Sequence, residues 1–258
     1  MDRVSAIPSI LRKIALKVEK AKDFRSIYLD DKGFLSNSDL IAHDAFLENI
    51  KNLFPNDRIF SEEGKESDFY SKPDSRYTWV IDPICGTTNF VNSIPFYSHS
   101  ITLVEENQAI AAGVFDPSRD EMFYSNGQDF YINDKKYKLD NKKKLSEALV
   151  SFNTNQSNFD DKKNSLESIL DRVAPPICRR IHILESANLE LAYVAAGRID
   201  VYVNPTDKPW DIAAAKIFLS TAGGDCRIIH TESKDILQQQ GIIAAGSQSL
   251  LGEVEKLL

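Results

Sequence analysis

The segment from residue 77 to residue 92 constrains the fold more than any other part of the chain, and it reads YTWVIDPICGTTNFVN. The apolar, β-branched and aromatic run from Tyr77 to Ile81 predicts a buried strand, which Asp82-Pro83 is expected to end. Gly86 permits a close or left-handed turn, and Thr87 is a good N-cap for a helical turn. The segment therefore predicts a carboxylate at a strand end beside a helix N-terminus, an arrangement that suits a phosphate held with a cation.

Length and composition exclude several classes of protein. The 258 residues allow one large domain or two small domains that share a core, and 42% hydrophobic with 27% charged residues is ordinary for a soluble globular protein. The net charge of -7 argues against non-specific nucleic-acid binding. No stretch resembles a signal peptide or approaches the roughly 20 apolar residues of a membrane span, so we expect a cytoplasmic protein without membrane contacts.

The N-terminal half, residues 1–145, predicts helices followed by an antiparallel meander. Apolar residues at helical spacing predict a helix over about 6–22, and a second helix is expected over 38–53 with Ser38 as its cap. Short β-rich runs joined by tight turns predict strands over 58–61, 77–82, 98–104, 109–115 and 121–124. The lysine-rich residues 133–146 favour a surface hairpin or a linker between halves over a basic binding patch.

The C-terminal half, residues 146–258, alternates strands and helices, which favours an α/β arrangement. The expected strands cover residues 147–152, 179–183, 199–203, 225–230 and 241–245. The expected helices cover residues 161–173, 187–197, 210–222 and 247–257.

Carboxylates occur at the edges of four predicted elements: Asp39, Glu62 with Glu63, Asp82, and Asp211. Each has an ordinary structural explanation when it is taken alone. An acid in the first turn of a helix, such as Asp39 or Asp211, is favoured by the helix dipole, and acids before Gly64 would usually lie in a solvated loop. The case for a functional site therefore rests on the four segments together.

The motif DPICGTTNF resembles the DP[IL]DGTxNF signature of the inositol monophosphatase family, which comprises magnesium-dependent, lithium-sensitive phosphatases of sugar and cyclitol phosphates. The order of SEEG, DPICGTTNF and WDIAAAKIFLSTAGG is similar to the order of that family's three metal-binding segments. The segment ESANLELAYVAAGRID, Glu185 to Asp200, is similar as well. The resemblance covers the chain from about residue 36 to its C-terminus.

The resemblance implies a layered αβαβα sandwich of the sugar-phosphatase type, with metals at the junction of two halves and a homodimer as the usual assembly. It implies a first magnesium held by Glu62, Asp82 and the backbone carbonyl of Ile84. Asp82 would bridge to a second magnesium that Asp211 also binds. Thr87, polarised by Asp39, would orient the attacking water with help from Glu62. Amides around Gly86 and Thr87 would receive phosphate oxygens.

Cys85 departs from the signature, because the family has its second motif aspartate at this position. Magnesium binds sulfur poorly, so we expect the second site to be less occupied, or to be filled by a softer ion such as manganese or zinc. A thiol beside a dication could also be deprotonated and reactive. Cys178 and Cys226 are expected to be small buried residues, because three scattered cysteines form neither a disulfide framework nor a zinc motif.

Two further positions differ around the expected substrate pocket. Glu185 stands where a glycine usually precedes the Ser-Ala pair, here Ser186 and Ala187, and Asn204 stands where mammalian enzymes place a glutamate that holds inositol hydroxyls. These differences argue against myo-inositol 1-phosphate as the preferred substrate. If Glu185 lines the pocket, it favours a substrate with a cationic group, while the alternative is an exposed loop acid.

Three functions remain open from the sequence. The first is a phosphatase of a small sugar, cyclitol or nucleotide phosphate with altered metal dependence, which the retention of the other expected ligands supports. The second is a catalytically impaired relative that binds a phosphate ligand or a protein. The third is a cysteine nucleophile at Cys85, which the lack of an HCxxxxxR pattern disfavours.

Overall fold

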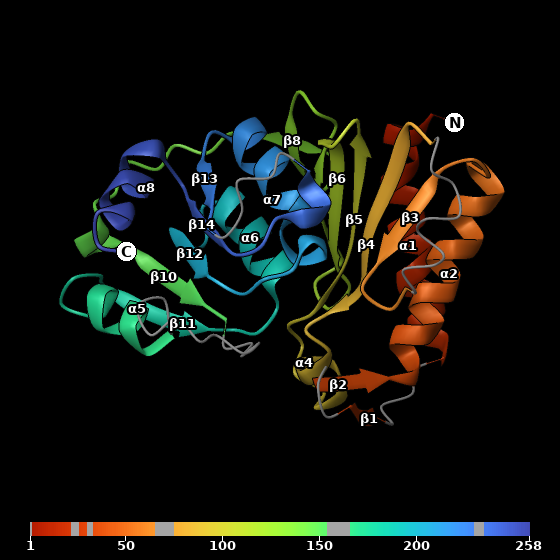
Figure 1. The fold of residues 1–258 in the computed structure, drawn as a ribbon, viewed down its shortest axis with the longest axis horizontal. Helices are drawn as coiled ribbons and strands as arrows, with labels where there is room; N and C mark the ends of the chain where they lie inside the picture. Colours follow the sequence, from red (N-terminus) through yellow and green to blue (C-terminus); the bar gives the residue numbers. More distant parts are fainter. Residues whose placement is uncertain (1, 22–25, 30–32, 65–74, 154–165, 230–234) are drawn as a thin grey trace.

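The computed structural model describes residues 2–21, 26–29, 33–64, 75–153, 166–229 and 235–258. Within these ranges the chain forms five stacked layers (Figure 1). Helices α1 and α2 cover one face of a seven-stranded sheet, and α6 and α7 lie between that sheet and a five-stranded sheet. Helices α5 and α8 cover the outer face of the second sheet. The predicted αβαβα sandwich is confirmed.

The first sheet has the order β3-β4-β5-β6-β7-β8-β9, with β3 and β4 parallel and the other neighbours antiparallel. Its strands are Arg58–Ser61, Tyr77–Cys85, Ser98–Glu105, Gln108–Asp116, Glu121–Ser125, Phe130–Ile132 and Lys135–Tyr137. The described part of the chain also forms a small hairpin of β1 (Ser26–Leu29) and β2 (Gly33–Ser36).

The second sheet has the order β11-β10-β12-β14-β13, in which β10 pairs in parallel with both β11 and β12. Its strands, in chain order from β10, are Leu149–Phe152, Arg180–Ile183, Val201–Asn204, Asp225–Ile228 and Ile242–Ala245. The described α-helices are α1 Arg3–Ala21, α2 Asn37–Leu53, α4 Thr87–Val91, α5 Leu166–Val173, α6 Ala187–Ala195, α7 Pro209–Ala222 and α8 Gln248–Glu255. Two 3-10 turns, Leu145–Glu147 and Ile236–Gln238, complete these elements.

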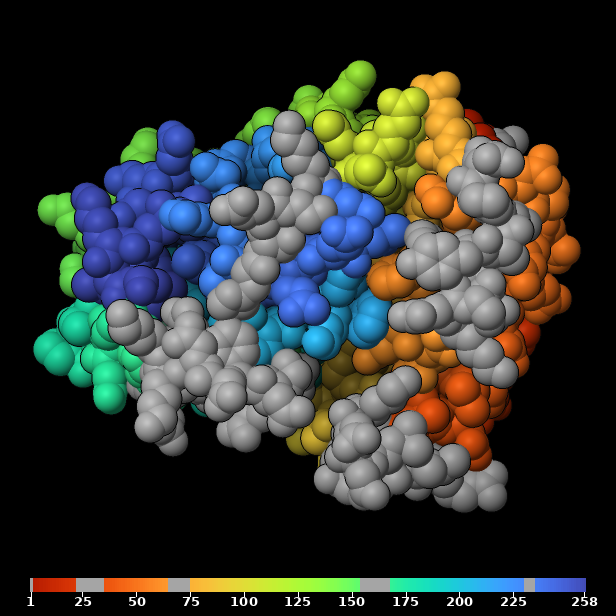
Figure 2. All heavy atoms as spheres, viewed as in Figure 1, coloured from red at the N-terminus to blue at the C-terminus, as the bar shows by residue number. Residues whose placement is uncertain are grey.

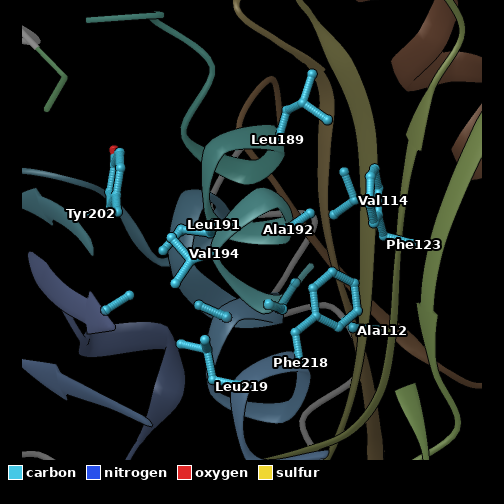
Figure 3. Packing of buried hydrophobic residues seen from close by; sticks show 14 of the residues in the cluster. Ala112, Val114, Phe123, Leu189, Leu191, Ala192, Val194, Tyr202, Phe218 and Leu219 are labelled. Atoms are coloured by element: carbon cyan, nitrogen blue, oxygen red, sulfur yellow. The ribbon is translucent and has the colours of Figure 1, made fainter. Parts of the chain in front are cut away.

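Buried apolar side chains join the layers into a continuous interior. The central cluster joins side chains of the first sheet to side chains of α6 and α7, as Figure 3 shows for Phe123, Ala192 and Phe218. Burial of large apolar side chains contributes about 1.5–3 kcal/mol each, so this cluster holds the two halves together. Figure 2 shows the resulting face, on which blue segments of the C-terminal half lie directly against the orange and yellow segments of the first sheet.

The division predicted between residues 145 and 146 falls in the connection between the two sheets. However, α6 and α7 of the C-terminal half contact strands of both sheets. These helices give the two halves one shared core, and the division into two domains stays a prediction.

Two local predictions near the site were wrong. Asp82-Pro83 does not end the strand, since β4 continues to Cys85 across a register shift between Asp82 and Cys85. A proline can be accommodated at such a bulge, where the ladder of backbone hydrogen bonds is already interrupted. The cap of α2 is Ser36 and not Ser38, because the Ser36 hydroxyl accepts the Asp39 backbone N–H at 3.3 Å.

The lysine-rich segment forms a surface hairpin over part of its length. Residues 135–137 pair with 130–132 as β8 and β9, and most lysines of residues 133–146 are exposed. The lysines therefore lie on the outside of the sheet edge. Among the described residues, no helix combines the length and apolar character that crossing a membrane requires.

Candidate functional site

The bulged end of β4 positions the central carboxylate of the site. Asp82 is 1% exposed and lies opposite Ser100 of β5. The neighbouring Pro83 carbonyl accepts a hydrogen bond from His99 Nδ1 at 2.5 Å, and burial lowers the pKa of His99 to about 4, so this imidazole is neutral and structural. The ladder is interrupted after Asp82 and resumes where Cys85 pairs with Ser98 of β5, and the Cys85 carbonyl there accepts the Ser186 hydroxyl at the start of α6.

Two further carboxylates converge on Asp82 from distant parts of the sequence. One carboxylate oxygen of Asp82, one of Asp211 and the Sγ of Cys85 all lie within 4.8 Å of one another. Glu62, in the turn after β3, lies close enough to Asp82 and Asp211 for their charges to raise its pKa. Asp211 lies in the first turn of α7, where the Lys208 backbone N–H donates to its Oδ2 at 2.8 Å. The structure thus brings together the three acids that the sequence predicted as metal ligands.

The electrostatics of these acids are those of a site built for a cation. Burial raises the pKa of Glu62 and of Asp82 well above their ordinary values, and repulsion from neighbouring carboxylates raises both further. Burial also raises the pKa of Asp211 to about 6, against the opposing effect of the Lys208 amide. Such raised pKa values indicate that a positive charge is needed before all three groups can ionise together.

One atom shows directly where a cation fits. The Oδ1 of Asp82 is buried and has no hydrogen-bond partner among the described residues. A buried carboxylate oxygen without a partner costs free energy, and a divalent ion that prefers hard oxygen ligands would satisfy it. The donor set of Glu62, Asp82 and the Ile84 carbonyl therefore fits a magnesium-like cation.

Thr87 links this carboxylate group to Asp39 at the start of α2. Its hydroxyl lies 3.0 Å from Asp39 Oδ1 and 3.1 Å from the Ile84 carbonyl oxygen, and it can donate to either. The Ser36 backbone N–H donates to the other oxygen of Asp39, Oδ2, at 2.8 Å, and Asp39 is 2% exposed. Burial raises the pKa of Asp39, while hydrogen bonds from Ser36 and Thr87 partly offset this shift. The pair can therefore hold the Thr87 oxygen in one orientation.

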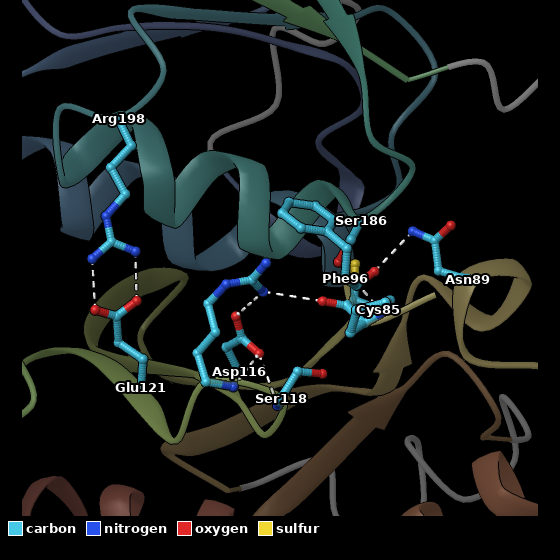
Figure 4. Close-up of polar contacts among 10 residues, drawn as sticks. Cys85, Asn89, Phe96, Asp116, Ser118, Glu121, Ser186 and Arg198 are labelled. Carbon is cyan, nitrogen blue, oxygen red and sulfur yellow. Dashed lines mark hydrogen bonds and ion pairs between the residues drawn. The ribbon is translucent and has the colours of Figure 1, made fainter. Parts of the chain in front are cut away.

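Gly86 makes the corner between β4 and α4 possible. Its φ of 95° lies in the left-handed region, and an added Cβ would lie 3.0 Å from the Glu185 carbonyl oxygen and 3.1 Å from the Ser186 Cβ. The Ser186 hydroxyl donates to the Cys85 carbonyl at 2.9 Å, and Figure 4 shows the two residues side by side. This close approach brings the N-terminus of α6 against the DPICGTTNF corner.

Cys85 lies at this contact with its thiol buried. The Asn188 backbone N–H donates to Sγ at 3.3 Å. Burial raises the pKa of Cys85 well above its ordinary value, and the charges of Asp82 and Asp211 raise it further. In the cation-free site the thiol is therefore neutral, and a cysteine nucleophile is disfavoured.

The other predicted substrate residues lie around the same junction and differ in burial and in hydrogen bonding. Ala187 is buried at the start of α6, and Glu185 is half-buried with a φ of 59°. Asn204 is 1% exposed at the end of β12, and its amide is used within the fold. Its Nδ2 donates to Asp207 Oδ1 at 2.6 Å, and its Oδ1 accepts the Thr206 backbone N–H at 2.9 Å.

Four polar residues near the site were not predicted from the sequence: Ser36, Asn188, Glu190 and Asp207. Ser36 had a signal, because Ser36 to Asp39 has the spacing of a capping box. Glu190 is fully buried and accepts the Ser186 backbone N–H at 3.0 Å, and burial raises its pKa to about 8. Asp207 is buried beside Tyr202, whose hydroxyl donates to it at 2.8 Å. Asn188 gave no local signal, since an asparagine in the first turn of a helix is ordinary.

Comparison with known proteins identifies the same family over nearly the whole chain. The model of the inositol monophosphatase family matches residues 5–257. The Nus factor SuhB of Pasteurella multocida is 32% identical over 215 residues, which cover 82% of this chain and 78% of that protein. The fructose-1,6-bisphosphatase/inositol-1-monophosphatase of Thermotoga maritima is 32% identical over 235 residues, covering 87% of this chain and 84% of that protein. The solved Thermotoga maritima IMPase has a TM-score of 0.82 at 27% identity, over 100% of this chain and 98% of that chain.

Proposed function

The chain belongs to the inositol monophosphatase family and is a metal-dependent phosphoric monoester hydrolase, and we propose that Glu62, Asp82, Asp211 and Thr87 form its catalytic centre. The observation that carries this proposal is the buried, partnerless Asp82 Oδ1 among acids that raise one another's pKa. The family resemblance assigns the first cation to Glu62, Asp82 and the Ile84 carbonyl. Magnesium is the proposed ion, because all three supply hard oxygen ligands.

The bound cation lowers the pKa of a water molecule and stabilises charge on the phosphate and leaving oxygens. The chain itself supplies orientation and proton acceptance. Thr87, held by Asp39, would accept a hydrogen bond from the attacking water, and Glu62 would take the proton of that water. The backbone amides around Gly86 and Thr87, at the start of α4, receive phosphate oxygens. No side chain forms a covalent bond with phosphate in this scheme.

The resemblance places a second cation between Asp82 and Asp211, where Cys85 supplies sulfur in place of a carboxylate. We expect this position to hold magnesium weakly or to accept a softer ion such as manganese or zinc. Three carboxylates remain to balance charge at the centre, which is enough for one dication with an excess of one negative charge. With Cys85 in place of an aspartate, the site therefore needs a second dication less, and we expect phosphate hydrolysis to continue.

The proposed substrate is a small sugar, cyclitol or nucleotide phosphate, and not myo-inositol 1-phosphate in particular. The substrate contacts that we propose are Gly86, Thr87, Glu185, Ser186, Ala187 and Asn204. Asn204 already bonds Asp207 and Thr206 with its amide, which leaves it a weaker partner for sugar hydroxyls than a glutamate would be. If Glu185 lines the substrate pocket, its carboxylate favours a substrate that carries an amino group or another cation.

The test is release of inorganic phosphate from a panel of sugar, aminosugar, cyclitol and nucleotide monophosphates, each with magnesium, manganese or zinc. We expect hydrolysis by the wild-type chain with at least one metal. A Cys85→Asp variant tested in parallel separates the two sequence hypotheses. Activity in that variant alone, under every metal, would favour the impaired binding module, and no hydrolysis by either form would contradict the phosphatase assignment.

The resemblance also suggests a cytoplasmic homodimer, in which each chain keeps its own complete set of acids. Within the described residues, all proposed metal ligands come from one chain. Light scattering of the purified protein tests the assembly, and a monomer with full activity would contradict a dimer requirement.

A further inference from the structure

We propose that the side-chain amide of Asn188 occupies the position of the second cation, so that this chain binds one divalent ion tightly where its carboxylates alone would invite two. The inference rests on the cation-dependent function proposed above and adds a residue that decides the number of ions. It concerns the side of Asp82 that faces Cys85 and Asp211, which we call the donor side. The side that faces Glu62 and Ile84 is called the acceptor side.

Asn188 directs the N–H groups of its side-chain amide at acceptors on the donor side. Asn188 is 1% exposed in the first turn of α6. Its Nδ2 donates to Asp82 Oδ2 at 3.0 Å and to the Trp210 carbonyl oxygen at 3.2 Å. The residue that follows this carbonyl is Asp211. The amide nitrogen therefore bridges the two segments that a second cation would have to join.

The orientation of this amide follows from its neighbours. An ionised carboxylate and a backbone carbonyl can only accept hydrogen bonds, and an asparagine amide donates only through its nitrogen. A rotation that exchanged Nδ2 and Oδ1 would place the Asn188 oxygen against two acceptors. The Asn188 Oδ1 has no hydrogen-bond partner among the described residues, which shows that the two bonds through nitrogen determine the orientation.

The groups around Cys85 are also hydrogen-bond donors. The Asn188 backbone N–H donates to Sγ at 3.3 Å, and the Ser186 hydroxyl donates to the Cys85 carbonyl at 2.9 Å. Both groups belong to the N-terminus of α6, whose dipole carries a partial positive charge. Besides the carboxylates of Asp82 and Asp211, a cation entering the donor side would meet this helix end, an amide nitrogen and a sulfur atom that magnesium binds poorly.

The acceptor side has the opposite character. The Asp82 Oδ1 is buried and has no hydrogen-bond partner among the described residues, and the charges of Glu62 and Asp82 repel each other in the absence of an ion. Asn188 occupies Oδ2 and leaves Oδ1 available. One carboxylate thus offers one oxygen to a cation and the other to an amide, which limits the site to one tightly held ion.

The experiment counts bound Mn²⁺ per full-length chain by equilibrium dialysis with electron paramagnetic resonance detection, without substrate. We expect one tightly bound Mn²⁺ in the wild type. Asn188→Asp replaces the donor by an isosteric carboxylate and is expected to strengthen the second binding step by about tenfold or more, the range typical of residues that support metal ligands. Asn49→Asp is the matched control: it adds the same charge on α2, ten residues or about 15 Å along the helix from Asp39, and should leave the count unchanged.

Asn188→Ala decides between a competitor and a ligand. If the amide excludes the second ion, its removal strengthens that binding step, and an unchanged binding step would overturn the proposal. A variant that loses a bound Mn²⁺ would show that Asn188 is itself a ligand, and this would overturn the proposal. Tight binding of two Mn²⁺ by the wild type would overturn it as well, while phosphate release would still support the enzyme. Absence of Mn²⁺ binding in every folded form would contradict both the inference and the proposed function.

Discussion

The two sides of Asp82 lie a few ångströms apart and differ in the groups that they present. On the acceptor side, where we propose that Glu62 and the Ile84 carbonyl bind a cation, the Asp82 Oδ1 has no hydrogen-bond partner among the described residues. On the donor side, Asn188 and the N-terminus of α6 present N–H groups to Asp82 and Cys85. In our proposal the same fold thus combines an oxygen site for one cation with a neighbouring position where hydrogen-bond donors replace a second one.

This difference shows that the arrangement of helices and strands does not by itself determine how many ions a site binds. The sheets and helices bring Asp82, Cys85 and Asp211 within coordination range. Whether an ion binds then depends on individual atoms, because an amide nitrogen and a carboxylate oxygen of similar size have opposite polarity. Variants on the two sides should therefore have unequal effects on activity.

Glu62→Gln is expected to have the largest effect, because we propose Glu62 as both a metal ligand and a proton acceptor on the acceptor side. Loss of several kcal/mol of transition-state stabilisation corresponds to a fall in kcat of about 10³-fold. Glu63→Gln is the matched control, since it removes a neighbouring charge that raises the pKa of Glu62 but removes no proposed metal ligand, and its kcat should fall far less than that of Glu62→Gln. Steady-state phosphate release at saturating magnesium makes the comparison.

If Glu63→Gln lost activity and Glu62→Gln retained it, the acceptor side would have been assigned to the wrong carboxylate. Equal losses in both variants would point to a general effect of charge. Circular dichroism of both variants provides the check on folding.

Thr87→Val should have the next largest effect. The valine keeps the β-branched shape but removes the hydroxyl that lies 3.0 Å from Asp39 Oδ1 and 3.1 Å from the Ile84 carbonyl. We expect kcat to fall by about 10²-fold, at the lower end of the range for proton transfer by a positioned group. Thr88→Val changes an exposed neighbour and should have little effect on kcat. A similar loss in both would indicate a structural role in α4.

The pH dependence of metal stabilisation tests whether the acids need the ion. Burial raises the pKa of Asp211 to about 6, from about 3.9 in an unfolded chain. Its contribution to stability in the metal-free protein is therefore present below about pH 4 and is lost as the pH rises through about 6. Magnesium binds the ionised acids, so the rise in Tm on adding magnesium should be larger at pH 8 than at pH 5.

At 100 times the Kd, a bound ligand stabilises a protein by about 2.7 kcal/mol, or roughly 5–10 °C in Tm for a chain of this size. Differential scanning calorimetry at both pH values, with and without magnesium, measures this difference. Asp211→Asn should reduce the dependence of the metal-free Tm on pH between about 4 and 6. An equal rise in Tm at pH 5 and pH 8 would mean that the acids are already ionised at the lower pH.

Much of this arrangement could be predicted from the sequence, because hydrophobic periodicity and short motifs are local signals. They predicted the strand before Asp82 and the meander over β5 to β7, while the family resemblance implied the αβαβα layers and indicated which acids to group. The length of β4 could not be predicted, because the continuation through Asp82-Pro83 depends on pairing with β5 across a bulge. The short β8–β9 pair was likewise seen only as a hairpin or linker.

The role of Asn188 could not be predicted for a related reason. Its partners are Asp82 and Cys85, more than one hundred positions earlier in the chain, and the Trp210 carbonyl. No local pattern encodes such a contact, since it exists only after α6 has packed against the end of β4. The sequence identifies Cys85 as a departure from the family motif. That Asn188 lies beside this cysteine is seen only in the folded structure.

Two serines that cap helices with their hydroxyls, Ser36 and Ser247, allow the test with the smallest expected effect on kcat. Ser36 caps α2 and bonds Asp39, whereas Ser247 caps α8 by accepting the Leu250 backbone N–H at 3.3 Å. Replacing either by alanine should lower the free energy of unfolding by about 1 kcal/mol, the usual cost of a lost cap. Only Ser36→Ala should also reduce kcat, because Asp39 then loses a group that orients it toward Thr87. Urea unfolding and phosphate release on the same samples separate the two effects. Equal kcat values in the two variants would show that the Asp39–Thr87 pair keeps its geometry without Ser36.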